Sequence, residues 1–413
     1  MDLFQISAIL LTASAVGSFI NYKWIKLPSS ISLLLMAMVI SLVGIFCEKL
    51  GLIRIHHLQE FLSNINFKEI VFHGMLSFLL FAGALQVEIK DLKEARLPVF
   101  LTATISTFLS TIIIGFVFYI FANNLGFFNV TLPYALLFGA ILSPTDPIAI
   151  FSIIRKLNTP KKIETTIMGE SLFNDGVAIA FFLVILELIN TPADAHIFNG
   201  MIFFFREVGG GILVGGVIGL IANQMLLKTD DYHVELFITL AVATGGYALA
   251  EKLHVSAPLA MVVAGIIIGN VSRVHAMSNP TRQHIDSFWG AIDEILNTVL
   301  FFLIGLEMIV INATGKIVFL GLGCILIALI ARFISVVIPL SILKAFTRDK
   351  RAKTVLLTWG GLRGAISIAM VLSLQSNNLK EIFLPCVYLV VIFSIAVQGL
   401  TFSKLLKAYK MEI

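Results

Sequence analysis

The chain has 413 residues, of which 58% are hydrophobic and only 13% are charged, and its net charge is +4. A soluble protein carries about 25% charged residues, so the composition excludes a soluble globular fold and indicates an integral membrane protein. The basic residues lie in short loops between apolar runs, a pattern typical of topology determinants, so we expect no nucleic acid among its partners.

The first apolar run, Leu3 to Ile20, follows an acidic residue and precedes Lys23 and Lys26. This charge order is opposite to that of a cleaved signal peptide and predicts a first membrane span with its N-terminus outside. Twelve further runs approach the length of about 20 residues that a bilayer requires. They cover residues 28–46, 69–88, 97–122, 131–154, 163–189, 201–227, 234–250, 256–270, 285–308, 316–343, 354–374 and 381–403. The sequence therefore predicts an all-α polytopic membrane protein with 13 transmembrane helices.

The basic residues support this topology. Of the 29 Lys and Arg residues, twenty fall in loops assigned to the cytoplasm and six in loops assigned outside, while Arg206, Arg332 and Arg363 fall within spans. Cytoplasmic loops are enriched in Lys and Arg. We therefore expect a multi-pass protein of the plasma membrane with its C-terminus in the cytoplasm, where about ten residues after Ser403 offer no long regulatory tail.

Two spans carry helix-breaking residues. The fifth contains Ser-Pro-Thr-Asp-Pro at 143–147, and the twelfth contains Trp-Gly-Gly-Leu-Arg-Gly-Ala at 359–365. Proline removes a helical donor and disfavours helix at the preceding residue, so the fifth span is expected to be two half-helices joined by an extended piece. In the twelfth span, three glycines and Arg363 break an otherwise apolar run. An offset of seven spans is odd, so the two broken spans run in opposite directions. Spans 1–6 and 8–13 then form two inverted six-helix repeats, with span 7 as the linker.

The sixth span carries Gly-Glu-Ser-Leu-Phe-Asn-Asp-Gly at residues 169–176. An ionised acid in hydrocarbon is costly, so such residues are functional candidates. Ser171 and Asp175 are four residues apart and share one helix face, with Glu170 and Asn174 on the adjacent stripe. Together with carbonyl groups released near Thr145 by the broken fifth span, these oxygens suit a monovalent cation. The alternative is that Asp175 and Asn174 are polar core groups that hold the helices together.

These two broken-span motifs, the 169–176 motif and Ala331-Arg332 in the eleventh span together resemble the sodium/proton antiporters of the cation:proton antiporter 1 family, of the bacterial NhaP type. The resemblance implies a homodimer in the cell inner (plasma) membrane that transports Na⁺ and H⁺ and needs no other cofactor. It implies that Asp175 binds the cation and the proton in alternation. The implied cation/proton-binding residues are Asp175, Asn174, Ser171, Thr145 and Asp146, with Asp175, Ser171 and Thr145 as the Na⁺ ligands.

The resemblance also assigns the remaining charges within the spans. Glu170 is expected to form a structural ion pair with Arg332, and Asp146 and Arg363 are expected to lie where the two broken helices cross. The predicted division is a scaffold of dimerisation helices 1–3 (residues 1–96), a core of helices 4–6 with the ion site (97–190), linker helix 7 with scaffold helices 8–10 (191–312), and core helices 11–13 with a short cytoplasmic C-terminus (313–413).

These charges also predict the stoichiometry. The charges of Asp146 and Arg363 would offset the half-helix dipoles and one another. The charges of Glu170 and Arg332 would cancel in the same way. Asp175 then remains the single uncompensated charge, which either a proton or a cation can neutralise. Because an empty, ionised core should not cross the apolar barrier, the sequence predicts electroneutral one-for-one exchange by alternating access.

Some questions stay open at this stage. A passive cation channel or a solute symporter could use a similar fold, whereas the motifs of an intramembrane hydrolase are missing. The choice among Na⁺, Li⁺ and K⁺ is open. Asp293, Glu294 and Glu307 either line a vestibule of the cation path or lie at the membrane interface. A glycine ladder in the seventh span, Gly211, Gly215 and Gly219, predicts close helix packing within the protomer.

Overall fold

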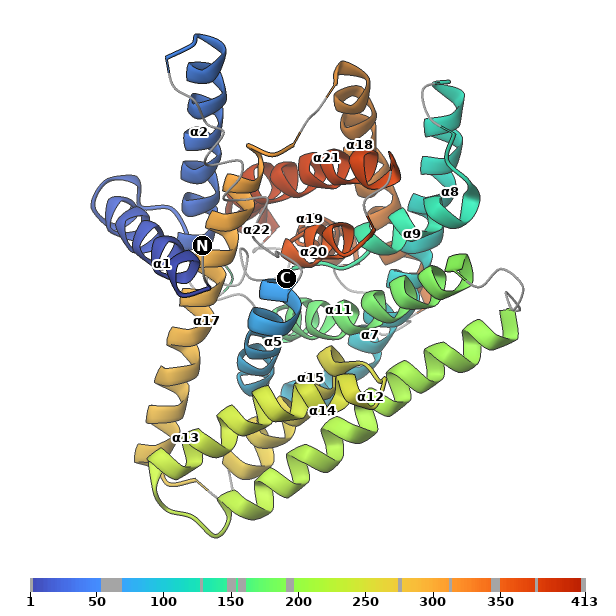
Figure 1. Ribbon diagram of the computed structural model, residues 1–413. Helices are drawn as coiled ribbons and strands as arrows, with labels where there is room; N and C mark the ends of the chain where they lie inside the picture. The colour runs from blue at the N-terminus through green and yellow to red at the C-terminus, as the bar shows by residue number, and fades with distance from the viewer. Residues whose placement is uncertain are drawn as a thin grey trace.

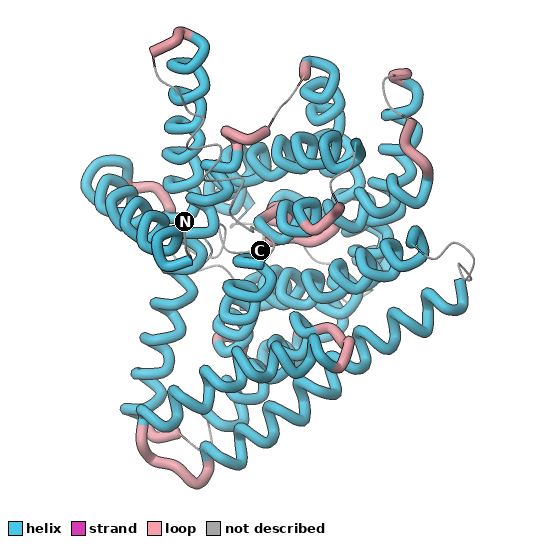
Figure 2. Tube along the Cα trace, in the orientation of Figure 1, coloured by secondary structure: helices cyan, strands magenta, loops and turns pink. Residues whose placement is uncertain are grey.

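The structure is a computed structural model. It describes residues 3–52, 69–126, 129–146, 154, 161–190, 197–273, 277–311, 314–342, 350–375 and 378–409. Helices joined by short loops account for this part of the chain, and no strand occurs within it (Figures 1 and 2). The all-helical prediction is confirmed over the described residues.

The helices of the first half are α1 (Leu3–Ile20), α2 (Ser29–Lys49), α5 (Leu76–Leu85), α6 (Ile89–Glu94), α7 (Arg96–Phe100), α8 (Thr107–Asn124), α9 (Leu132–Leu142) and α11 (Lys161–Asn190). Those of the second half are α12 (Ile197–Leu226), α13 (Tyr232–Ala241), α14 (Tyr247–Lys252), α15 (Ala257–Ile267), α17 (Asn279–Glu307), α18 (Gly315–Ile342), α19 (Lys350–Trp359), α20 (Ala365–Leu372), α21 (Asn378–Phe393) and α22 (Leu400–Tyr409). Wider π-helical turns extend or join several of them: η1 (Asn21–Ile25), η2 (Ile70–Met75), η3 (Leu101–Ser106), η5 (Val242–Gly246), η6 (Ile268–Ser272) and η8 (Ser394–Gly399).

Within the described residues, nine continuous helices are long and apolar enough to cross a bilayer, and three shorter apolar helices accompany them. The short ones cover Ile70–Leu85, Leu132–Leu142 and Ala257–Ser272. Residues 147–153 of the predicted fifth span, including Pro147, lie outside the described residues. The count of thirteen spans and the inverted repeat therefore stay predictions.

Two helices begin before the apolar runs that predict them, and one of these starts is set by a polar cap. The tenth span was expected at 285–308, but α17 begins at Asn279, with Pro280 in its first turn. α13 begins earlier than the expected residue 234 because the Asp231 carboxylate accepts bonds from the His233 and Val234 amides at 2.8 and 3.3 Å. Capping side chains satisfy the first free amides of a helix. Apolar periodicity does not record such caps.

The helices pack in two groups. In the first, α17 lies against α1, α2, α5 and α13, and α15 lies against α5 and α12; in Figure 1, α12 runs along one edge of the molecule. In the second, α8 packs on α9 and α18, α11 packs on α9, and α21 packs on α18 and α20. Contacts of α11 with α12 and α15 join the two groups.

Close helix approach within the first group depends on the glycine ladder. A Cβ atom on Gly215 would lie 2.3 Å from the Ala260 carbonyl oxygen of α15, and one on Gly211 would lie 2.6 Å from that of Ser256. The prediction that the ladder packs helices within the protomer is confirmed.

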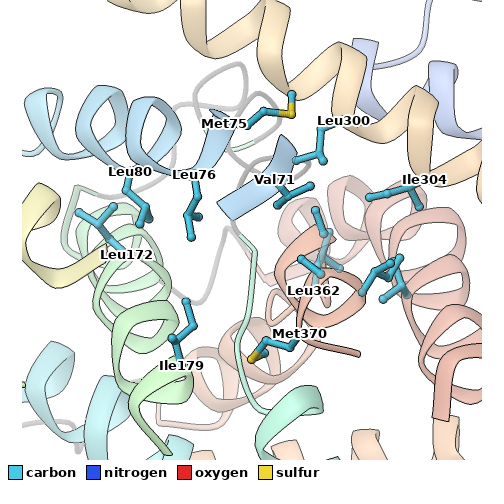
Figure 3. Packing of buried hydrophobic residues seen from close by; sticks show 14 of the residues in the cluster. Val71, Met75, Leu76, Leu80, Leu172, Ile179, Leu300, Ile304, Leu362 and Met370 are labelled. Carbon is cyan, nitrogen blue, oxygen red and sulfur yellow. The ribbon is translucent and has the colours of Figure 1, made fainter. Parts of the chain in front are cut away.

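Apolar side chains fill the space where the groups meet. Figure 3 shows Leu80 of α5 beside Leu172 of α11, and a Cβ atom on Gly83 would lie 3.5 Å from Leu172 Cδ1. Ile179, two turns further along α11, is also buried. These residues belong to a single buried cluster of apolar side chains that includes residues of both groups.

Candidate cation site

The two interrupted spans cross near the centre of the second group. α9 ends at Leu142 and residues 143–146 are not helical, while α19 ends at Trp359 and α20 begins at Ala365. We call these two extended segments, 143–146 and 360–364, the crossing. The Asp146 amide donates to the Leu362 carbonyl at 2.7 Å, so one extended backbone is bonded to the other.

Arg363 lies at the C-terminal end of α9. Its Nη1 donates to the carbonyl oxygens of Ser143 and Pro144 at 2.6 and 2.9 Å, and the side chain is buried. Carbonyl groups at a helix end have no partner within the helix and form the negative end of its dipole. The guanidinium therefore supplies both donors and positive charge where α9 stops.

Asp146 lies at the N-terminal end of α20. A Cβ atom on Gly364, the residue before α20, would lie 2.2 Å from Asp146 Oδ2. A carboxylate at this position is stabilised by the positive end of the helix dipole. Glycine is required at 364 because any side chain would displace the carboxylate. The two residues expected at the crossing are both there.

Asn174 connects α11 to the crossing. Its Nδ2 donates to Thr145 Oγ1 at 2.6 Å, and its Oδ1 accepts from the Thr145 amide at 3.4 Å. Thr145 Oγ1 also lies 3.2 Å from Ser171 Oγ. Asn174 is fully buried, and both ends of its amide are used to hold Thr145. The structure thus brings together the predicted residues Ser171, Asn174 and Thr145.

Asp175 follows on the next stripe of α11, with 6% of its surface exposed. It lines a cavity of about 500 Å³, and Asp146 and Ser171 line the same cavity. The wall formed by α17 includes Asp293 and Glu294. Asp293 and Glu294 therefore line the same cavity as Asp175, and their part in a cation path stays a prediction.

Glu307 has a different position. It is the last residue of α17, is buried, and is not among the residues that line the cavity.

Lys380, which the sequence did not single out, donates to the carbonyl oxygens of Leu372 and Leu374 at 2.9 and 3.1 Å and so caps the C-terminal end of α20. A cationic side chain at a helix C-terminus is the signal that could have identified it.

Glu170 and Arg332 form the expected ion pair between α11 and α18. Arg332 Nη1 donates to Glu170 Oε1, and its Nη2 donates to the Leu357 carbonyl at 3.0 Å in the last turns of α19. Both side chains are buried, Glu170 with 1% of its surface exposed. A Cβ atom on Gly361 would lie 2.4 Å from Arg332 Nε, so this glycine makes room for the guanidinium.

Comparison of the sequence with known proteins identifies its family. The sequence model of the transmembrane sodium/hydrogen exchanger family matches residues 9–408. The Na⁺/H⁺ antiporter NhaP of Pseudomonas aeruginosa is 40% identical over 405 residues, which are 97% of this chain and 95% of the relative. The chain belongs to the sodium/hydrogen exchanger family.

Further relatives agree with this exchanger assignment. The Na⁺/H⁺ antiporter NhaH of Halobacillus aidingensis is 32% identical over 97% of both chains. The solved sodium proton antiporter MjNhaP1 of Methanocaldococcus jannaschii has the same fold, with a TM-score of 0.75, 20% identity and 98% of each chain covered. The resemblance stated from the motifs alone is confirmed, and the protein is a multi-pass membrane protein of an antiporter family.

Proposed function

We propose that this protein exchanges one monovalent cation for one proton, and that Asp175 binds the two in competition. The cation is Na⁺, with Li⁺ and K⁺ as further candidates. The observation that carries the proposal is that the acids near the crossing have different surroundings. Glu170 is paired with Arg332, and Asp146 faces the N-terminus of α20. Asp175 lines the cavity together with Asp146, but it lies in the middle of α11, away from a helix end, and forms no ion pair among the described residues, so it is the acid that a cation or proton can neutralise.

The number of charges supports electroneutral exchange. With Glu170 and Asp146 compensated, the core around Asp175 is neutral when that carboxylate holds one proton or one monovalent cation. It carries a net charge only when Asp175 is empty. Moving a charge through an apolar barrier is costly, so the loaded forms cross and the empty one does not.

The cavity supports an inward-open state. Its lining includes Ser29 at the start of α2 and Gln86 at the end of α5. These ends adjoin the loops with Lys23, Lys26 and Lys90, which the charge bias assigns to the cytoplasm. We therefore propose a plasma-membrane protein with its N-terminus outside, its C-terminus inside and this cavity open to the cytoplasm.

The two packing groups support an alternating-access mechanism. We propose that α7 to α11 and α18 to α22 form the moving core, and that the remaining helices form a scaffold that dimerises. Symmetric dimers are the commonest soluble assemblies, and a core that moves needs an anchored counterpart.

Proteoliposomes test the proposal. A Na⁺ gradient should drive proton flux at the same rate whether a potassium/valinomycin potential is held at zero or imposed, and acid should inhibit by competing with Na⁺. The Asp175→Asn variant should be folded and inactive. A rate that follows the voltage would mean that a second acid changes protonation. Uptake of labelled Na⁺ without counter-flow of protons would identify a channel instead.

A further inference from the structure

Asn297 on α17 lines the cavity and has a buried oxygen without a hydrogen-bond partner among the described residues. Its side chain is 2% exposed and is part of the cavity lining. Its Nδ2 donates to Asp293 Oδ1 at 2.9 Å, while its Oδ1 has no hydrogen-bond partner among the described residues. Buried polar atoms without a partner are rare and call for a missing ligand or a functional reason.

The orientation of this amide is fixed by its neighbour. If the side-chain amide of Asn297 were rotated by about 180°, its oxygen would face the Asp293 carboxylate, and two acceptors cannot form a hydrogen bond with each other. The nitrogen therefore faces Asp293, and the oxygen is the atom left over.

Asp293 and Asn297 are four residues apart, so they lie on one face of α17, one turn apart. A carboxylate and an amide oxygen are ligands that suit a hard cation. Glu294 at the cavity, where Ser29 Oγ donates to its Oε1 at 3.3 Å, adds negative charge and disfavours an anion. A tightly held divalent cation would need more oxygen ligands than these two side chains provide.

We propose that Asp293 and Asn297 form a vestibular subsite that binds a partly hydrated monovalent cation before it reaches Asp175. The inference rests on the proposed function, because it adds a step to the same cation path. It also predicts sidedness. The subsite lies on α17, in the proposed scaffold, and lines the cavity, so it serves only those cations that enter from the cavity face.

The first test is the Na⁺ KM of the Asn297→Leu variant in membrane vesicles of both orientations. We expect KM to rise by about tenfold when Na⁺ enters from the cavity face, as expected for one lost charge-assisted contact, and to stay unchanged from the other face. The maximal rate should stay the same. Asp293→Asn, at a half-buried position, should give the same one-sided rise. Gln283→Leu, an exposed amide on the same helix outside the cavity, is the matched control and should change nothing.

The second test does not depend on transport. A structure of the Asp175→Asn protein with Tl⁺, a heavy monovalent cation, should show Tl⁺ beside Asn297 Oδ1, and the added Asn297→Leu change should remove it. This peak would persist even if the protein failed to exchange protons, which separates the two proposals. An ordered water with no Tl⁺ at Asn297, or a KM that is unchanged or rises equally from both faces, would overturn the subsite.

Discussion

The Glu170–Arg332 pair should stabilise the fold without taking part in ion binding. In an Arg332→Met variant, Glu170 would remain at 1% exposure without its partner, and the Leu357 carbonyl would lose its donor. Breaking a buried pair from one side costs about 3–5 kcal/mol. An unfolding entropy of about 2.1 cal/mol/K per residue gives about 0.9 kcal/mol/K for a chain of this length, so the thermal midpoint should fall by about 3–6 °C.

The assay is thermal unfolding of the purified protein in detergent, followed by intrinsic fluorescence. Glu170→Leu combined with Arg332→Met should recover most of the loss, because no buried charge is left unpaired, and about 1 kcal/mol should remain for the Leu357 carbonyl. Asp175→Asn is the control and should keep the wild-type midpoint. If a Glu170→Ala single variant unfolds at the wild-type temperature but does not transport, Glu170 belongs to the ion site and the structural role is refuted.

Three further predictions concern the crossing, the boundary between the groups and the assembly. Gly364→Ala should abolish exchange, since its Cβ atom would lie 2.2 Å from Asp146 Oδ2, whereas Gly216→Ala, with no atom within 4 Å, should transport normally in the same vesicle assay. Gly176→Ala should slow transport because its Cβ atom would lie 2.4 Å from Leu259 Cγ, and the added Leu259→Ala change should restore the rate; a double variant as slow as the single one would contradict this contact. Cross-linking in native membranes should yield dimers, and full transport by a protein that gives only monomers would count against a dimeric scaffold.

Sequence predicted the parts of the site that depend on local chemistry. The interruptions of the fifth and twelfth spans follow from proline and glycine, which change the backbone wherever they occur. The shared face of Ser171 and Asp175 follows from helical periodicity. By contrast, the Glu170–Arg332 pair joins residues 162 positions apart, and only the family resemblance brought them together. Asn297 was missed because a neutral amide does not interrupt an apolar run.

Hydrogen bonds join helices within each group. In the first group, Trp289 Nε1 of α17 donates to Thr239 Oγ1 of α13 at 3.1 Å, and Ser41 Oγ of α2 donates to the Gly305 carbonyl of α17 at 2.9 Å. In the second, Arg332 bonds to both α11 and α19. Such bonds depend on distance and angle, so they hold their helices in fixed relative positions.

The boundary between the groups has ion pairs of Lys161 with Glu88 and Asp91 at its exposed edge, at 3.6 and 3.7 Å, and apolar contacts in its buried part. Leu259 of α15 packs against Gly176, and Leu172 packs beside Gly83 and Leu80. Apolar contact has no preferred direction, so one surface can shift along the other as long as both stay covered. α11 carries Asp175 and is bonded to α18 and to the crossing. In the proposed mechanism, a shift at this boundary would therefore move the carboxylate together with both broken spans, so the geometry around a bound ion would be kept while the access to it changes.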